Sequence, residues 1–309
     1  MALDPCASIR EANTERIDIV AASKGIVAAV ILACNTVAVA CCMAPLALLK
    51  FALPAGRMRR LTDQMLNTLA ECWIGINGTW IAAVGRIRWE VSGLDGLNPA
   101  RWYLLASNHQ SWVDIFVLQK VFHRRVPLLK FFLKRELIYV PVIGLAWWAL
   151  DFPFVRRSGG VRRSKEDVEA TRKSCERFRT IPTAVINFLE GTRFTDAKAL
   201  AQRSPYRHLL KPKAAGMTIA LATMGEKFDA LLDVTIVYPG GVPSFWDLLS
   251  GRIENVIVTT RELPLPPVLV RSDAVRDPAF RGAVQCWIQD LWAEKDRRIE
   301  ELLQGTHAR

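Results

Sequence analysis

Residues 102–122 read WYLLASNHQSWVDIFVLQKVF, and three kinds of segment follow one another in this stretch. Trp102 to Ser107 is an apolar run that predicts a buried strand, and Trp112 to Phe122 predicts a helix. Between them lies a short polar turn. Because α/β proteins place functional groups where a strand gives way to a helix, this turn is the first candidate for a site.

Strand and helix patterns alternate along the chain beyond residue 86. Arg86 to Val91 alternates polar and apolar residues, which predicts an exposed strand. Further strands are expected at 152–155, 183–189, 231–238 and 255–260, and further helices at 164–178 and 279–303. This order predicts an α/β fold with a mixed, mainly parallel sheet flanked by helices.

The N-terminal part of the chain has a different composition. Gly25 to Leu49 is almost wholly apolar and long enough to cross a hydrocarbon layer. Leu61 to Val84 is helical in pattern but less apolar, which suits an interfacial helix or one folded back on the first as a hairpin. The alternative is one spanning helix followed by an ordinary core helix. We therefore expect a membrane-anchoring pair of helices in residues 1–85 and a separate α/β domain in residues 86–309.

The chain is strongly basic, with a formal net charge of +11 and a pI of about 9.6. This charge implies an anionic partner, either nucleic acid or a lipid surface. The sequence has no zinc-finger spacing and no RNA-binding signature, so we expect no nucleic-acid partner. Basic residues directly follow the apolar segment, which favours an anionic membrane surface and a domain on its cytoplasmic side. They are Lys50, Arg57, Arg59 and Arg60.

Seven cysteines are scattered along the chain without a C-x-x-C pair. Such a set makes neither a disulfide framework nor a metal site. We expect reduced, mostly buried thiols in a cytosolic environment and no bound metal.

A basic run at Lys130, Lys134 and Arg135 is interleaved with the apolar residues 131–133. This mixture predicts contact with a membrane surface. The alternative is a solvated charged face, which is the usual place of such runs.

The turn in residues 107–114 contains His109 and, five residues later, Asp114. Residues five apart do not share one face of a helix, so the two side chains meet only if His109 lies on the turn before the helix. The carboxylate would then fix the imidazole tautomer and stabilise its protonated form. The alternative is a surface histidine near a solvated aspartate.

Residues 187–194, NFLEGTRF, lie at the end of another predicted buried strand. Gly191 allows backbone to approach a ligand closely, and Arg193 offers a planar fork suited to phosphate. The alternative is a strand-to-loop turn with a structural ion pair. No G-x-S-x-G elbow or P-loop is present, so neither a lipase-like triad nor nucleotide chemistry is indicated.

Together, in this order, these two stretches resemble the PlsC-type glycerolipid acyltransferases, also called lysophosphatidate acyltransferases. The family's first motif, N-H-x4-D, matches Asn108, His109 and Asp114, and its third, E-G-T-R, matches residues 190–193. Weaker matches to the other motifs are Lys134 to Leu137 with Pro141 and Gly144, Phe154 to Arg157, and Val237 to Pro239.

The resemblance covers about residues 86–260 and is closest to a bacterial YihG-like branch. That branch is indicated by Trp89 to Val91, by Lys213 to Gly216 and by Trp292 to Arg297. The chain departs from the family pattern at Leu189, where a proline is common, and in a longer insertion at residues 195–212.

The resemblance implies an acyltransferase domain in residues 86–309. Such a domain is expected to move a fatty acyl group from an acyl thioester, acyl-CoA or acyl carrier protein, to the sn-2 hydroxyl of 1-acyl-glycerol-3-phosphate, without a cofactor. His109 is expected to be the general base and Asp114 to orient it. The residues implied to bind the acceptor are Glu190, Gly191, Thr192 and Arg193, with Arg157 and Lys134 as helpers.

Other functions stay open from the sequence. The acceptor could instead be lysocardiolipin or a lyso-ornithine lipid. A catalytically idle membrane-binding protein and a basic nucleic-acid-binding protein are further alternatives, against which the intact motifs and the apolar segment speak. The resemblance also implies a place on the bacterial inner membrane, with the catalytic domain on the cytoplasmic side.

Overall fold

The structure is a computed structural model that describes residues 5–54, 56–140, 143–152, 154–155, 181–270 and 277–307. The helix expected at residues 164–178 lies outside these described residues.

A six-stranded sheet forms the centre of the chain, and its strand order is β1-β8-β7-β2-β6-β3. Neighbouring strands are parallel except β7 and β8, which are antiparallel, so the expected mixed, mainly parallel sheet is confirmed. The strands are β1 (Arg88–Ser92), β2 (Tyr103–Ser107), β3 (Leu129–Phe131), β6 (Ala184–Phe188), β7 (Ala230–Val237) and β8 (Asn255–Leu263). A separate parallel pair joins β4 (Leu133–Lys134) to β5 (Phe154–Val155).

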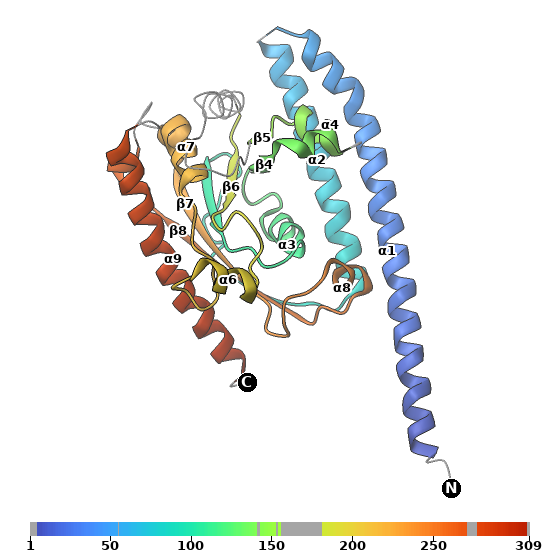
Figure 1. Cartoon of the computed structure of the whole chain (residues 1–309). Coiled ribbons are helices and arrows are strands. Elements are labelled where there is room, and N and C mark those ends of the chain that lie inside the picture. Colours follow the sequence, from blue (N-terminus) through green and yellow to red (C-terminus); the bar gives the residue numbers. More distant parts are fainter. Residues whose placement is uncertain are drawn as a thin grey trace.

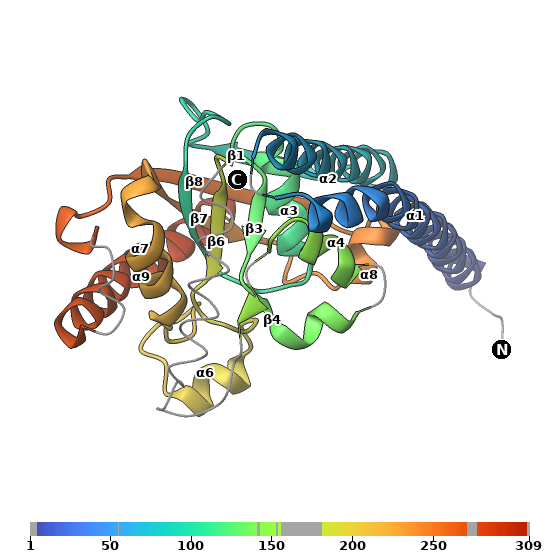
Figure 2. The same cartoon turned by 90° about the horizontal axis from the view of Figure 1, so that it is seen from above.

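Helices cover both faces of this sheet (Figures 1 and 2). Alternation along the fully buried β2 directs Tyr103 and Leu105 to one face and Leu104 and Ala106 to the other. The first face packs against α1 (Pro5–Ala52), α2 (Arg57–Val84) and α3 (Val113–Phe122), and the second against α7 (Ala215–Met224) and α9 (Pro278–His307). Shorter helices are η1 (Arg135–Tyr139), α4 (Ile143–Ala149), α6 (Asp196–Gln202), η2 (Gly225–Lys227), α8 (Phe245–Ser250) and η3 (Pro267–Leu269).

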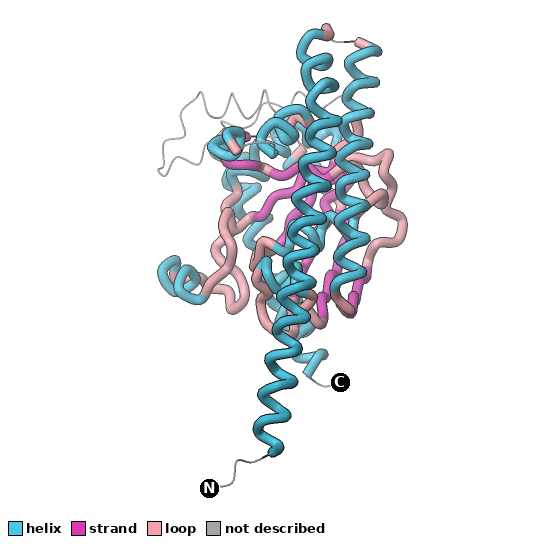
Figure 3. Tube along the Cα trace, turned by 90° about the vertical axis from the view of Figure 1, so that its right-hand side faces the viewer, coloured by secondary structure: helices cyan, strands magenta, loops and turns pink. Residues whose placement is uncertain are grey.

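The first two helices form the hairpin that was one of the two expectations for this region (Figure 3). A buried amide pair lies between them, where Asn35 Nδ2 donates to Asn77 Oδ1 at 3.0 Å. A polar pair inside an apolar helix interface favours one register, because any slip would leave these groups unpaired. On its other side α2 packs against α3, with Trp73 and Trp80 ring centroids 6.2 and 6.4 Å from that of Phe116.

Both ends of the apolar stretch of α1 contact the α/β domain. Near the start, Gly25 packs so closely on Trp246 of α8 that an added Cβ would lie 2.8 Å from the indole ring. Near the end, Lys50 Nζ forms ion pairs with Asp63 at 2.7 Å and with Asp151 at 2.5 Å. Residues 25–50 rise about 38 Å in an α-helix, so α1 runs along the domain over that length.

In the described part of the chain, one helix is long and apolar enough to cross a membrane. It covers Ile19–Ala52, with a mean hydropathy of 2.4. The side of α1 away from α2 and the domain keeps large apolar side chains exposed, among them Ile26, Val27, Val30, Val37 and Leu48.

The helical hairpin and the sheet share one buried cluster, in which Leu66 and Ile74 of α2 join Tyr103 and Leu105 of β2. The division into two domains at residue 85 was based on sequence composition. Because the buried cluster continues across that point, the division stays a prediction.

Two expectations about burial were wrong. Lys130 and Phe131 lie in strand β3 and are buried, at 5% and 7% exposed, so they do not form a membrane-contacting face. Burial lowers the pKa of Lys130 to about 8. The thiols expected to be buried are exposed and free at Cys34, Cys41, Cys42, Cys72 and Cys286. Three of them lie on α1, where apolar residues face outward.

Candidate active site

The turn between β2 and α3 lies at the carboxyl ends of β6, β2 and β7, which are parallel neighbours. Asn108 fixes this turn to β7. Its side chain donates to the Ile236 carbonyl at 2.8 Å and accepts from the Ile236 N–H at 2.9 Å. These two bonds extend the hydrogen bonding between β2 and β7 beyond the end of β2, through a side-chain amide in place of backbone. This role of Asn108 could not be predicted from the sequence, because its partner lies 128 residues away.

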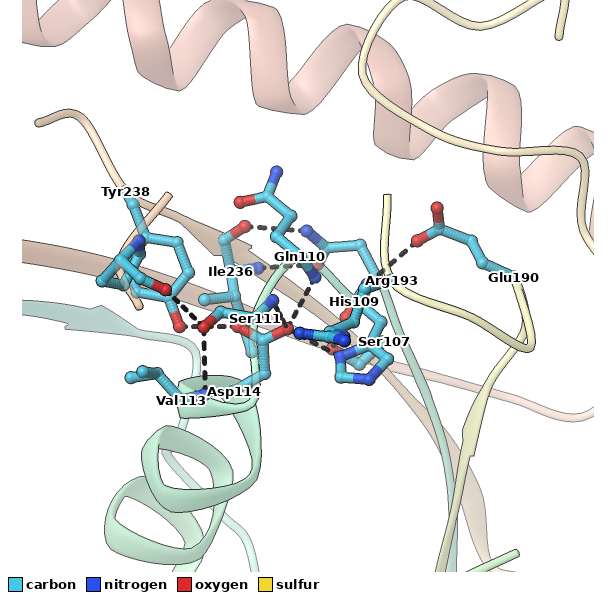
Figure 4. Close-up of polar contacts among 12 residues, drawn as sticks. Ser107, His109, Gln110, Ser111, Val113, Asp114, Glu190, Arg193, Ile236 and Tyr238 are labelled. Carbon is cyan, nitrogen blue, oxygen red and sulfur yellow. Dashed lines mark hydrogen bonds and ion pairs between the residues drawn. The ribbon is translucent and has the colours of Figure 1, made fainter. Parts of the chain in front are cut away.

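The side chains of His109, on the loop before α3, and Asp114, in the first turn of α3, contact each other as expected (Figure 4). His109 Nδ1 lies 2.8 Å from Asp114 Oδ2, and the side chains are 13% and 1% exposed. A carboxylate only accepts hydrogen bonds, so this geometry assigns the proton to Nδ1 and leaves the Nε2 lone pair available. An imidazole held in this way can accept a proton from a bound hydroxyl.

Backbone and side-chain donors surround the Asp114 carboxylate. Oδ2 also accepts from the N–H groups of Gln110 and Ser111, at 2.6 and 2.9 Å. Oδ1 accepts from the Tyr238 hydroxyl at 2.6 Å. A buried charge costs free energy unless it is hydrogen-bonded, and these donors together with the N-terminus of α3 supply that stabilisation.

The plane of the His109 ring is fixed by an aromatic stack. Phe188, the last residue of β6, lies parallel to it with ring centroids 4.1 Å apart and an interplanar angle of 17°. This contact could not be predicted from the sequence, since residues 188 and 109 are brought together by the pairing of β2 with β6.

Glu190, which was expected to bind the acceptor, links two loops of the site in the structure. Its side chain is fully buried, and its two oxygens accept from the N–H groups of His109 and Leu210, each at 2.9 Å. The side chain thus joins the two motif loops, and its part in acceptor binding stays a proposal. Burial raises the pKa of Glu190 to about 7, against the effect of the two N–H groups.

The loop after Glu190 presents the remaining third-motif residues. Gly191 has φ +68°, a conformation that favours glycine, and an added Cβ would lie 3.3 Å from Lys213 Cδ. Arg193 is exposed, with its guanidinium 5.1 Å from the centroid of the Trp112 ring. The Phe194 N–H donates to the His109 carbonyl at 2.7 Å, which holds this loop beside the histidine.

Lysine 198 of α6 also contacts this loop. Its ammonium donates to Thr192 Oγ1 at 3.0 Å and to the Arg193 carbonyl at 2.8 Å. Of the two expected helper residues, Arg157 lies outside the described residues. Lys134 lies in β4, but its side chain is not among the described ones.

The insertion at residues 195–212 is braced by α9. Asp296 accepts from the N–H groups of Arg207 and His208, at 3.0 and 2.8 Å, and Trp292 Nε1 donates to the Leu210 carbonyl at 3.1 Å. The Leu210 N–H in turn bonds to Glu190. The C-terminal motif at residues 292–297 therefore supports the loops of the site from behind.

Comparisons with known proteins identify a family and several relatives. Residues 88–239 match the family model described as Acyltransferase. Lysocardiolipin acyltransferase 1 of Danio rerio is 27% identical over 272 residues, 83% of this chain and 66% of that protein. The 1-acyl-sn-glycerol-3-phosphate acyltransferase gamma of Mus musculus is 28% identical over 174 residues, 53% of this chain and 43% of that protein.

The chain thus spans just under two thirds of the first relative's length and less than half of the second's. A crystal structure of the 1-acyl-sn-glycerophosphate acyltransferase PlsC from Thermotoga maritima is similar with a TM-score of 0.49 and 17% identity. That similarity covers 88% of this chain and 98% of the solved one.

Proposed function

This chain belongs to the acyltransferase family, and on that premise we propose that it moves a fatty acyl group from an acyl thioester to the sn-2 hydroxyl of 1-acyl-glycerol-3-phosphate, giving phosphatidic acid. The observation that carries the proposal is the His109–Asp114 pair, 2.8 Å apart, beside the exposed guanidinium of Arg193. His109 as a base and Arg193 as a cation that can pair with a phosphate lie on adjoining loops. This arrangement suits an acceptor that carries both a hydroxyl and a phosphate.

In the proposed reaction, Nε2 of His109 takes the proton of the acceptor hydroxyl as its oxygen attacks the thioester carbonyl. A C–O bond forms, the carbonyl oxygen becomes negative, and the C–S bond then breaks as the carbonyl re-forms. The histidine returns its proton to the leaving thiolate, so the products are an ester and a free thiol. Asp114 stabilises the imidazolium between these two transfers.

We propose that Arg193 binds the acceptor phosphate and that Gly191 and Thr192 shape the loop around it. The support is the exposure of Arg193 and the left-handed backbone at Gly191, which only a small residue adopts without strain. Roles for Lys134 and Arg157 in acceptor binding remain proposals that rest on the family resemblance.

Replacing Arg193 with lysine is expected to raise the KM for 1-acyl-glycerol-3-phosphate about tenfold, because lysine keeps the charge but loses the two-pronged geometry. The change in kcat should be smaller. Initial rates at varied acceptor concentration measure both, and Arg298→Lys on the exposed side of α9 is the matched control. An unchanged KM in Arg193→Lys would remove Arg193 from phosphate binding.

Lysocardiolipin is the second candidate acceptor, because a lysocardiolipin acyltransferase is among the similar proteins. The purified protein should be offered lysophosphatidate, lysocardiolipin and lyso-ornithine lipid, each with acyl-CoA and with acyl carrier protein. Mass spectrometry of the lipid products then identifies acceptor and donor. We expect phosphatidic acid as the main product. Turnover of lysocardiolipin alone would show that lysocardiolipin is the acceptor instead. No product from any pair would indicate a catalytically idle protein.

We also propose that the α1–α2 hairpin lies in one leaflet of a bacterial inner membrane, with the catalytic domain on the cytoplasmic side. The support is geometric: Gly25 and Lys50 both contact the α/β domain, so a bilayer-crossing α1 would carry that domain into the hydrocarbon layer. The exposed apolar face of α1 and the basic residues after it suit the acyl and headgroup regions.

A topology measurement checks this arrangement. In a variant that keeps Cys286 of α9 and gains Ser8→Cys as its only other thiol, a membrane-impermeant maleimide should label both positions from the same side of sealed vesicles. Inverted inner-membrane vesicles should expose both thiols. Labelling from opposite sides would show that α1 crosses the bilayer.

A further inference from the structure

Tyr238 lies directly after the last residue of β7 and is bonded to the catalytic pair. Its hydroxyl donates to Asp114 Oδ1 at 2.6 Å, a length typical of a hydroxyl bonded to a charged oxygen. We propose that Tyr238 is a positioning residue, which fixes the orientation and charge of the Asp114 carboxylate and thereby sets the pH range in which His109 acts as base. This inference rests on the proposed acyl transfer.

The two carboxylate oxygens of Asp114 have different partners. Oδ2 accepts from two backbone N–H groups and faces His109, whereas Tyr238 is the donor to Oδ1 in the described part of the chain. The last torsion of an aspartate side chain is broad, so bonds to Oδ2 alone allow the other oxygen to swing. A donor on Oδ1 limits that swing, while the two N–H groups keep Oδ2 directed at the imidazole even when Tyr238 is replaced.

The fold holds Tyr238 in place through strand β7. Ile236, two residues earlier, is bonded through both backbone groups to Asn108, which fixes the register of β7 against the end of β2. Residues two apart on a strand face the same side, and Tyr238 packs in the same buried cluster as Ile236 and Val113. The ring is 5% exposed, so its hydroxyl has little freedom to find another partner.

The charge of Asp114 keeps this hydroxyl a donor. Burial, together with the neighbouring carboxylate, raises the pKa of Tyr238 well above its usual value of 10. The donated bond draws negative charge away from the carboxylate, so it moderates how strongly Asp114 favours the protonated imidazole. Loss of the bond should therefore stabilise protonated His109 and withdraw the base at neutral pH.

In the described part of the chain, two further charged groups beside His109 come from the loop after β6. They are Glu190, bonded to the His109 N–H, and the exposed Arg193. Lys295 of α9 lies behind Glu190 and pairs with Asp233 at 2.5 Å. These groups are unchanged when Tyr238 is replaced, so a change in the pH profile reports on Tyr238.

The test is Tyr238→Phe, assayed with oleoyl-CoA and 1-oleoyl-glycerol-3-phosphate between pH 5.5 and 9.5. At pH 7 kcat should fall about tenfold, the effect expected for one bond to a charged group, with the acceptor KM within about twofold of wild type. The acid limb of the pH profile of kcat should move to higher pH by about half to one unit. Much of the loss in kcat is then recovered at pH 9.

Tyr103→Phe is the matched control. It also removes the hydroxyl of a fully buried tyrosine, one that accepts from the Asn98 N–H at 3.0 Å at the far end of β2. This control should lose a similar amount of stability and keep the wild-type pH profile. If Tyr238→Phe has an unchanged acid limb, a limb moved to lower pH, or an equal loss at every pH, the positioning role is overturned.

A second substitution keeps the inference testable if Tyr238→Phe does not fold. 3-Fluorotyrosine introduced at position 238 keeps the ring and its packing but makes the hydroxyl a stronger donor. The acid limb should then move in the opposite direction, to lower pH, and no movement would again overturn the proposal. Absence of any transfer by the wild-type protein would instead contradict the proposed function.

Discussion

Replacing His109 with alanine is expected to lower kcat by about 10²- to 10⁴-fold, because a positioned general base commonly contributes that much to a proton transfer. The protein should still fold, since the His109 bonds to Glu190 and Phe194 run through its backbone and survive the substitution. Release of thiol from acyl-CoA in the presence of lysophosphatidate measures the loss, and circular dichroism checks the fold.

His123→Ala is the control for this variant. His123 lies at the end of α3 and contacts Glu71 of α2, with Nε2 3.1 Å from the Glu71 carbonyl. It should keep turnover within a few-fold of wild type. If His109→Ala retains turnover comparable to His123→Ala, then His109 is not the base.

Replacing Asp114 with asparagine should also lower kcat by about 10²-fold or more, with little change in the acceptor KM. The amide oxygen can still accept from the N–H groups of Gln110 and Ser111, so the turn is expected to persist. The negative charge that stabilises the imidazolium is lost, and in serine hydrolases with this arrangement such a loss is very large. Steady-state kinetics across a range of pH measure the effect.

Asp247→Asn provides a closely matched comparison. Asp247 lies in the first turn of α8 and accepts from the Ser244 N–H at 2.8 Å, as Asp114 accepts from Ser111 in the first turn of α3. In the described part of the chain its side chain is bonded to Ser244 and not to the catalytic pair, so its loss should cost about 1 kcal/mol of stability without affecting turnover. Equal activity of the two asparagine variants would limit Asp114 to a structural role.

Much of the sheet could be predicted because its strands are apolar runs with clear ends. The strands expected at 102–107, 183–189 and 231–238 are observed at Tyr103–Ser107, Ala184–Phe188 and Ala230–Val237. Strand β3 was missed because it is three residues long and has a lysine at its centre. Lys130 became buried through its place beside Lys50, Asp63 and Asp151, which belong to other elements and cannot be read from the local pattern.

The catalytic pair could be predicted because its two members lie five residues apart on one turn. The partners of that pair could not, since Phe188, Glu190 and Tyr238 reach it from two other strands. Their positions depend on the strand order β7-β2-β6, which local sequence does not specify. For the same reason the two backbone bonds of Glu190 could not be predicted.

The placing of the chain within a YihG-like branch stays a prediction, and so does the absence of a cofactor. The lysolipid panel and Arg193→Lys bear on the acceptor.

The most direct test of the account follows the acyl group itself. Wild-type protein is mixed with radiolabelled oleoyl-CoA, with or without 1-oleoyl-glycerol-3-phosphate, and both the intact protein mass and the released thiol are measured over the first turnovers. Direct transfer with His109 as base predicts an unchanged protein mass and thiol release that needs the acceptor, one thiol for each phosphatidic acid formed. An acylated protein, or thiol release without acceptor at the same rate, would contradict it.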